Sequence, residues 1–283
     1  MNHAAEIIEC VEALASLVES DAKVPAMQAR RDKATASGNR KIQKLVRDRL
    51  RKQRTSVLSS SALAKLHAAI NRSIPARALE ADRQVTAEDR DRISAEVAAA
   101  LSADVHGVPV TDAEQTAFSS AITQAVVSGD AGVSALLSST PGDTESFISE
   151  YLKDGGFTRL TGQIDKTTVD RLASAVADTY EKGASFDETV SAIRGEFADM
   201  TQYRAKMIAQ TELNDAYNQS IFHFGTAAGA TRKSWETDLA PCVVCIENAM
   251  AGEVEINSDF PSGDDAPPAH PNCLCSLLVH ADN

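Results

Sequence analysis

The sequence has 283 residues and a formal net charge of −12, with 43% hydrophobic and 5% aromatic residues. That length can hold two domains, and a core built mainly of Ala, Val, Leu and Ile is typical of closely packed helices. No apolar run approaches the roughly 18–20 residues that span a bilayer, and the acidic start lacks the basic region of a secretory signal. The composition therefore excludes a membrane span and favours synthesis in a reducing cytosol.

Positive charge is concentrated at 23–54, where twelve Lys or Arg residues stand against two acids. This segment carries +10, so the rest of the chain carries −22. Such asymmetry is typical of a basic arm that meets nucleic acid or the acidic face of a partner protein, the alternative being a solvated helix rich in arginine. The residues that we assign to partner or nucleic-acid binding are Arg40, Lys41, Lys44, Arg47, Arg49, Arg51, Lys52 and Arg54.

The N-terminal region, 1–141, is predicted to be helical. Apolar spacing indicates an amphipathic helix over 4–19, then a loose connection at 21–39 and a basic helix at 40–58 whose pattern continues to Pro75. Capping boxes beginning at Thr86 and Thr111 predict helices over 87–103 and 112–128, because the first side chain can accept the amide of the fourth residue. A short apolar turn at 133–137 precedes a boundary at 138–142.

A helical body is expected over 142–229, followed by a C-terminal lobe at 230–283. One helix covers 147–152, another runs from Thr167 or Thr168 to a left-handed cap at Gly183, and a third begins at Ser185. A long helix is predicted from about 201 to 228. Short strands at 231–237 and 276–279 should form a small sheet in the lobe. The predicted fold class is mainly α, with extended N-terminal helices, a compact helical body and a small α+β zinc-knuckle lobe.

The C-terminal lobe contains four of the five cysteines. Cys-x-x-Cys and His-x-x-Cys pairs each form a tight turn that can place two ligands on one cation, and two such turns supply the tetrahedron that structural zinc prefers. The alternative is two disulfides or unconnected thiols. A tetrahedron needs four ligands, so Cys273 or Cys275 is spare, and the spacing favours Cys273 as the ligand. The candidate ligands are Cys242, Cys245, His270, Cys273 and Cys275.

Polar residues crowd the predicted long helix, among them Arg204, Thr211, Glu212 and Asn218. They form either a hydrogen-bonded surface that docks the metal lobe or a partner, or simply the outer face of an amphipathic helix. Trp235, the only tryptophan, is expected to cover the metal.

Enzymatic motifs are missing from the sequence. Cys242-x-x-Cys245 matches half of a nucleobase-deaminase signature, but the required His-x-Glu does not precede it. The sequence contains no Gly-x-Ser-x-Gly elbow, no phosphate-binding Gly-x-x-x-x-Gly-Lys and no His-Glu-x-x-His. We therefore expect no catalytic residues, no small-molecule substrate and a closed, structural metal site.

Residues of about 145–280 resemble the phage head morphogenesis family, the minor head proteins similar to the F protein of phage Mu. The resemblance rests on the run 203–212 with Ala216 and Asn218, on Trp235 and Cys242-x-x-Cys245, and on the terminal run 267–275. The segments 164–168 and 183–186 also resemble that family. Gln210 and Leu274 depart from it, because the family often has arginine at both positions.

The resemblance implies a non-enzymatic minor capsid protein that is made in the host cytoplasm and resides in the virion. Such proteins associate with the portal vertex and assist head assembly, and some are thought to influence DNA packaging or ejection. The implied partners are portal protein, major capsid or scaffold protein, and packaged DNA, with no membrane. The alternatives are a zinc-dependent nuclease or toxin-type enzyme acting on nucleic acid, and a zinc-stabilised DNA-binding module.

Overall fold

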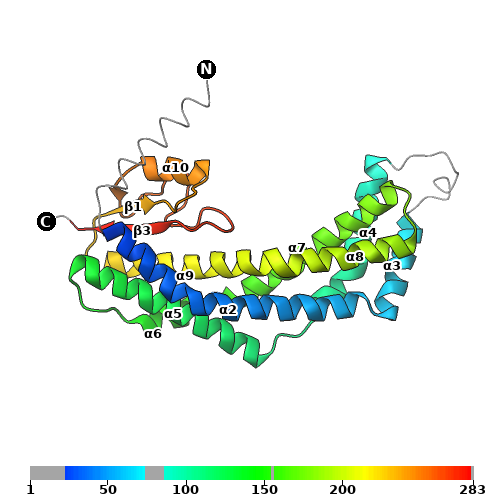
Figure 1. Ribbon diagram of the computed structural model, residues 1–283, viewed down its shortest axis with the longest axis horizontal. Helices are drawn as coiled ribbons and strands as arrows, with labels where there is room; N and C mark the ends of the chain where they lie inside the picture. Colours follow the sequence, from blue (N-terminus) through cyan, green and yellow to red (C-terminus); the bar gives the residue numbers. More distant parts are fainter. Residues whose placement is uncertain (1–22, 74–85, 154–155, 282–283) are drawn as a thin grey trace, which may run out of the picture. The chain divides into compact units, whose positions relative to one another are not determined.

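The computed structural model describes residues 23–73, 86–153 and 156–281, and it is mainly helical (Figure 1). The helix expected at 4–19 lies outside the described residues. The first described helix, α2, runs without interruption over Lys23–Val57, so the loose connection expected at 21–39 is wrong. Pro25 lies in the first turn, where its missing N–H costs nothing. Gly38 lies against Leu213, whose Cδ2 would be 3.0 Å from an added Cβ, so this glycine permits close packing and does not break the helix.

The next helices are α3 (Ser60–Ser73), α4 (Ala87–His106) and α5 (Asp112–Leu137). Both predicted capping boxes are confirmed: the hydroxyls of Thr86 and Thr111 accept the amides of Asp89 and Glu114 at 3.2 and 3.3 Å. The short turn expected at 133–137 is instead the last part of α5, because the buried face of that helix continues through Val133.

The following helices are α6 (Thr144–Lys153), α7 (Gly156–Glu181) and α8 (Phe186–Asp199). The predicted start of α7 at Thr167 or Thr168 is wrong, because both hydroxyls donate to the carbonyls four residues back and so satisfy themselves inside the helix. Gly183 ends this segment with φ +71°, as expected. The long helix expected at 201–228 is a π-helical turn, η2 (Met200–Arg204), followed by α9 (Ala205–Ala227).

Beyond α9 lies a three-stranded antiparallel sheet in the order β2-β1-β3. Strands β1 (Arg232–Glu236) and β3 (Ser276–His280) confirm the two predicted strands, with Trp235 opposite Leu277. Strand β2 (Val254–Glu255) and helix α10 (Val243–Met250) were not predicted. Gly225 of α9 allows close approach to β3, since an added Cβ would lie 2.8 Å from Val279 Cγ1.

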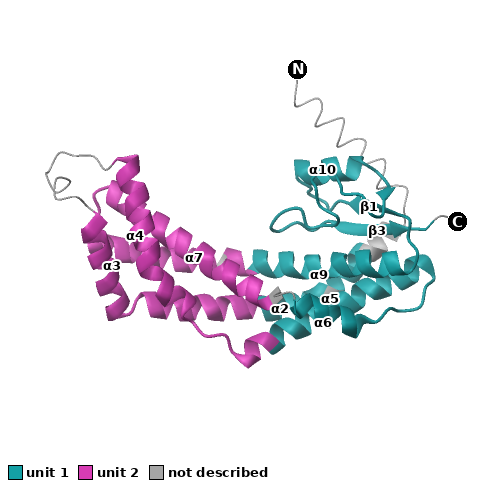
Figure 2. Cartoon of the chain, turned by 180° about the vertical axis from the view of Figure 1, so that it is seen from behind, with its two compact units in different colours: residues 1–42, 116–154, 206–283 teal, residues 43–115, 155–205 magenta. Residues whose placement is uncertain are grey.

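The chain divides into two compact units, each assembled from separate stretches of sequence (Figure 2). Unit 1 comprises residues 1–42, 116–154 and 206–283, and unit 2 comprises 43–115 and 155–205. The sequence predicted three consecutive regions, 1–141, 142–229 and 230–283. The two units differ from them because later helices return to pack on earlier ones. None of the described helices is both long and apolar enough to cross a membrane.

Candidate metal centre

The first pair of candidate ligands lies at the start of α10. Cys242 is the N-cap residue, and its carbonyl accepts the amide of Ile246 at 3.0 Å. Cys245 lies within the first turn and is buried, whereas Val243 and Val244 between the two cysteines are exposed. The free amides of this turn lower the pKa of the Cys242 thiol, against the opposing effect of its partial burial. The start of α10 therefore favours the thiolate form of Cys242, which is the form that binds a metal ion.

The second pair is held by a turn between β2 and β3. The amide of Cys273 donates to the carbonyl of His270 at 3.1 Å, and Asn272 adopts a left-handed conformation with φ +63°. His270 Nδ1 lies 2.9 Å from the Pro271 carbonyl. With the proton on Nδ1, this contact leaves Nε2 free to act as a ligand.

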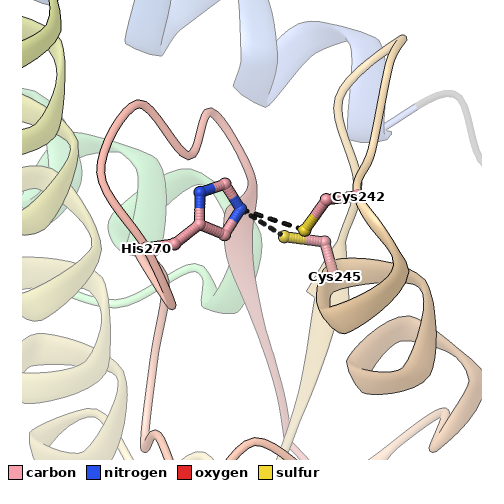
Figure 3. Close-up of side chains that lie close together, drawn as sticks. All are labelled: Cys242, Cys245 and His270. Atoms are coloured by element: carbon pink, nitrogen blue, oxygen red, sulfur yellow. Dashed lines mark hydrogen bonds between the residues drawn. The ribbon is translucent and has the colours of Figure 1, made fainter.

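The two turns face each other, so that His270 Nε2 lies 3.1 Å from Cys242 Sγ and 3.3 Å from Cys245 Sγ (Figure 3). Cys245 Sγ lies 3.7 Å from Cys273 Sγ. A zinc–sulfur bond of about 2.3 Å gives a tetrahedron whose sulfur–sulfur edge is about 3.8 Å. The spacing of the two sulfurs therefore matches two ligands of one ion.

The five candidate ligands form two overlapping groups with Cys245 in common. One group contains Cys242, Cys245 and His270, and the other contains Cys245, Cys273 and Cys275, with the ligand atoms of each within 4.8 Å of one another. This arrangement makes Cys245 the central ligand of the cluster. It could hold a metal ion, and the soft sulfur and imidazole donors suit zinc better than calcium or magnesium.

The protonation of the sulfurs is uneven. Hydrogen bonds with Cys273 and Cys275, together with burial, raise the pKa of the Cys245 thiol. Hydrogen bonds from Cys245 and Cys275 lower the pKa of Cys273 to about 2. The buried sulfurs thus share protons, since several adjacent thiolates would repel one another. A bound cation replaces those protons, so metal binding should release protons and weaken in acid.

The polar face of α9 anchors the segment that carries the second pair of ligands. Asn214 Nδ2 donates to the carbonyls of Cys273 and Cys275 at 3.1 and 2.9 Å. Asn218 Nδ2 donates to the Cys275 carbonyl at 3.1 Å, and its Oδ1 accepts the amide of Leu277 at 2.8 Å. Thr211 Oγ1 accepts the amide of Asn272 at 2.8 Å. The first of the two interpretations of this helix, a surface that docks the lobe, is therefore correct for Thr211 and Asn218.

The other two residues of that predicted surface, Arg204 and Glu212, belong to different units. Arg204 belongs to unit 2, where it donates to Thr168 Oγ1 at 3.1 Å and to the Ile164 carbonyl at 3.0 Å. Burial, reinforced by repulsion from Arg171, lowers the pKa of Arg204 to about 10. Glu212 is buried in unit 1. Arg204 therefore stabilises the helical unit and does not dock the lobe.

Trp235 is 2% exposed and packs edge-on against Phe260, with ring centroids 5.1 Å apart. That this side chain covers a bound metal stays a prediction. Lys233 of the same strand is fully buried, donates to the Asp265 carbonyl at 2.8 Å, and lies 4.4 Å from the centre of the Phe222 ring. No pattern in the sequence predicts that this lysine is buried.

The basic arm needs one correction. Arg49 was assigned to partner binding, but it is 3% exposed and forms a two-pronged ion pair with Asp165, at 2.8 and 2.6 Å. Gln53 Nε2 also donates to Asp165, at 2.7 Å. Arg49 therefore lies in the core of unit 2. The other assigned residues are exposed or half-buried, and these are Arg40, Lys41, Lys44, Arg47, Arg51, Lys52 and Arg54.

Arg31 is an anchor of the lobe that the sequence analysis missed. Its guanidinium donates to the Leu274 carbonyl and, at 3.1 Å, to Ser276 Oγ. Arg31, Thr35 and Ile42 are all buried at helical spacing, a periodicity that could have revealed this face of α2. This face was not predicted because residues 21–39 were interpreted as a loose connection.

Comparison of the chain with protein-family models, with curated proteins and with solved structures found no match.

Proposed function

We propose that the cluster binds one zinc ion through Cys242, Cys245, His270 and Cys273. In support of this ligand set, His270 Nε2 lies 3.1 and 3.3 Å from the sulfurs of Cys242 and Cys245, and the Cys273 sulfur lies 3.7 Å from that of Cys245. Cys273 belongs to a separate group from Cys242 and His270, joined to them through Cys245, so zinc binding would draw these ligands closer together. Four protein ligands would leave no position for water, so the ion would be structural. Cys275 would remain a thiol beneath Trp235.

We further propose that the chain is a minor capsid protein of a tailed phage that associates with the portal vertex and assists head assembly. The resemblance of 145–280 to phage head morphogenesis proteins motivates this role. The supporting observation is that the metal turns are hydrogen-bonded to α9 and α2, as expected for an ion that fixes a shape. The protein would reside in the virion after synthesis in the host cytoplasm.

The contact surface for the portal protein or for packaged DNA would be a basic stripe on α2. Its members recur at intervals of three or four residues, which places them on one side of the helix. Lys44 and Arg51 already pair with Asp48, at 2.8 and 3.0 Å, so a partner would compete with a weak exposed ion pair. We define the basic stripe as Lys44, Arg47, Arg51 and Arg54.

Co-purification with the portal protein of the same phage tests this role. Replacing the basic stripe by glutamine should reduce association while leaving the fold intact, because these side chains are not buried. Removing residues 1–60 would be uninformative, since Ile42, Leu45 and Leu50 belong to the core. The matched control neutralises four exposed cations elsewhere in unit 2, namely Lys65, Lys166, Lys182 and Arg194.

Absence of the intact chain from both portal complexes and assembled heads would reject the structural role. If the stripe variant and the control variant associate equally well with the portal protein, the basic stripe is not the contact surface, but the structural role is unaffected. If DNA is the partner, neutralising about four phosphates predicts that log K falls with log salt at a slope of about −3 to −4. A flat salt response would exclude DNA.

A further inference from the structure

The two groups of candidate ligands differ in character. The outer group, Cys242, Cys245 and His270, includes an exposed cysteine and a half-buried imidazole (Figure 3). The inner group, Cys245, Cys273 and Cys275, consists of sulfur alone, and each of its residues is at most 2% exposed. A single zinc ion with four ligands leaves Cys275 without a metal. The inner group therefore contains a donor that the proposed zinc site does not use.

The surroundings of the inner group favour an ion that needs only three ligands. Asn214 Nδ2 donates to the carbonyls of Cys273 and Cys275, and Asn218 Nδ2 also donates to the second of these carbonyls. The carbonyls beside the sulfurs are therefore engaged, and burial of the three cysteines keeps solvent water from a fourth position. Zinc prefers four ligands, whereas the softer Cu(I) is satisfied by three thiolate sulfurs.

Cys245 belongs to both groups, and a thiolate sulfur can bridge two metal ions through its lone pairs. With metal–sulfur bonds of about 2.3 Å, three sulfurs in a plane around one ion lie about 4.0 Å apart. The sulfurs of Cys245 and Cys273 are 3.7 Å apart, and the ligand atoms of each group lie within 4.8 Å of one another. Each group can therefore form a three-coordinate site with Cys245 as the shared ligand.

We propose that the cluster binds two Cu(I) ions in place of a single zinc ion. One Cu(I) ion is held by Cys242, Cys245 and His270. The other is held by Cys245, Cys273 and Cys275, so that the Cys245 sulfur bridges the two ions. Cu(I) reaches the buried sulfurs by ligand exchange from Cys242, which is exposed. The inference concerns the same cluster as the proposed zinc site, but it requires neither bound zinc nor the phage role.

Anaerobic addition of the Cu(I)–acetonitrile complex to the reduced full chain, as purified, tests the number of ions. Desalting in the presence of bicinchoninate, a Cu(I) chelator, removes weakly held copper, and elemental analysis then counts both metals. We expect two copper ions per chain and release of the zinc, because both metals need Cys245 and Cys273. X-ray absorption at the copper edge should show three sulfur or nitrogen neighbours for each ion and a second copper beyond a shared sulfur.

The informative variant is Cys275→Ser, which removes one ligand of the inner group and none of the proposed zinc ligands. We expect it to hold one copper ion and, before copper is added, one zinc ion. Cys242→Ser removes an outer ligand and should keep one copper ion in the inner group. Cys10→Ser removes the cysteine outside the cluster. It is the matched control and should still hold two copper ions.

A single copper ion in the unaltered chain would overturn the proposal, as would two in Cys275→Ser or a spectrum without copper–copper scattering. Two zinc ions per chain would show that the inner group finds a fourth ligand, and would equally overturn the preference for Cu(I). One zinc ion but only one copper ion would reject this inference and leave the zinc site standing. Two copper ions without stoichiometric zinc would support this inference and reject the zinc site.

Discussion

Replacing Asn218 by alanine tests whether α9 holds the metal-bearing lobe. Strand β3 is at the edge of the sheet, and the Asn218 side chain pairs with its free side through Leu277. The same amide donates to the Cys275 carbonyl at 3.1 Å and to the Asn214 carbonyl at 3.0 Å. One substitution therefore removes three hydrogen bonds in a fully buried setting.

The three bonds contribute unequally. The Cys275 carbonyl keeps the bond from Asn214 at 2.9 Å, whereas the Leu277 amide loses its side-chain acceptor. Leaving that buried donor unpaired costs about 1–3 kcal/mol, and losing the other bonds adds about 1 kcal/mol. We therefore expect Asn218→Ala to lower the free energy of unfolding by about 2–4 kcal/mol.

Urea denaturation of the metal-loaded protein, followed by far-UV circular dichroism, measures this difference from the midpoint and slope. Thr226→Ala on the same helix is the control, because it removes only a local, exposed bond to the Phe222 carbonyl. The control should change stability by less than about 0.5 kcal/mol. A similarly small effect of Asn218→Ala would refute the anchoring of β3 by α9.

Two further predictions concern unit 2. Arg49→Met should cost about 3–5 kcal/mol in urea unfolding, because it leaves the buried Asp165 carboxylate without its cation; a loss below about 1 kcal/mol would contradict this burial. Ser185→Ala should cost about 1 kcal/mol by removing the N-cap of α8. Hydrogen bonds from the Ser185 amide and hydroxyl lower the pKa of Glu188, so the contribution of this carboxylate is present above its unfolded pKa and lost as pH falls through the folded value. The free energy of unfolding should therefore fall less steeply at acid pH in Ser185→Ala than in the unaltered protein. The same pH dependence in both proteins would contradict this explanation.

Much of the fold could be predicted from the sequence because its signals depend on residues that are close together in the chain. Capping boxes at Thr86, Thr111 and Ser185 gave the starts of α4, α5 and α8, because a cap involves only four adjacent residues. The paired Cys and His spacings likewise predicted a cluster that the structure brings together. Each of these signals depends on neighbours in sequence.

What the sequence could not reveal depended on distant partners. Gly38 looked like a helix breaker because its packing on Leu213 lies far along the chain. Arg49 looked like its basic neighbours because its partner, Asp165, is 116 residues away. The start of α7 was misplaced because Thr168 resembles a cap, whereas its hydroxyl is buried beside Gln53, 115 residues away, and bonds inside the helix.

Elemental analysis of freshly purified, reduced protein tests the central claim most directly. We predict one zinc ion per chain, nearly complete loss in Cys245→Ser because that sulfur belongs to both ligand groups, and retention in Cys275→Ser. Chelation should unfold the lobe, since the binding energy of a structural zinc is also folding energy. Absence of stoichiometric metal, or a lobe that keeps its fold after complete chelation, would contradict the account.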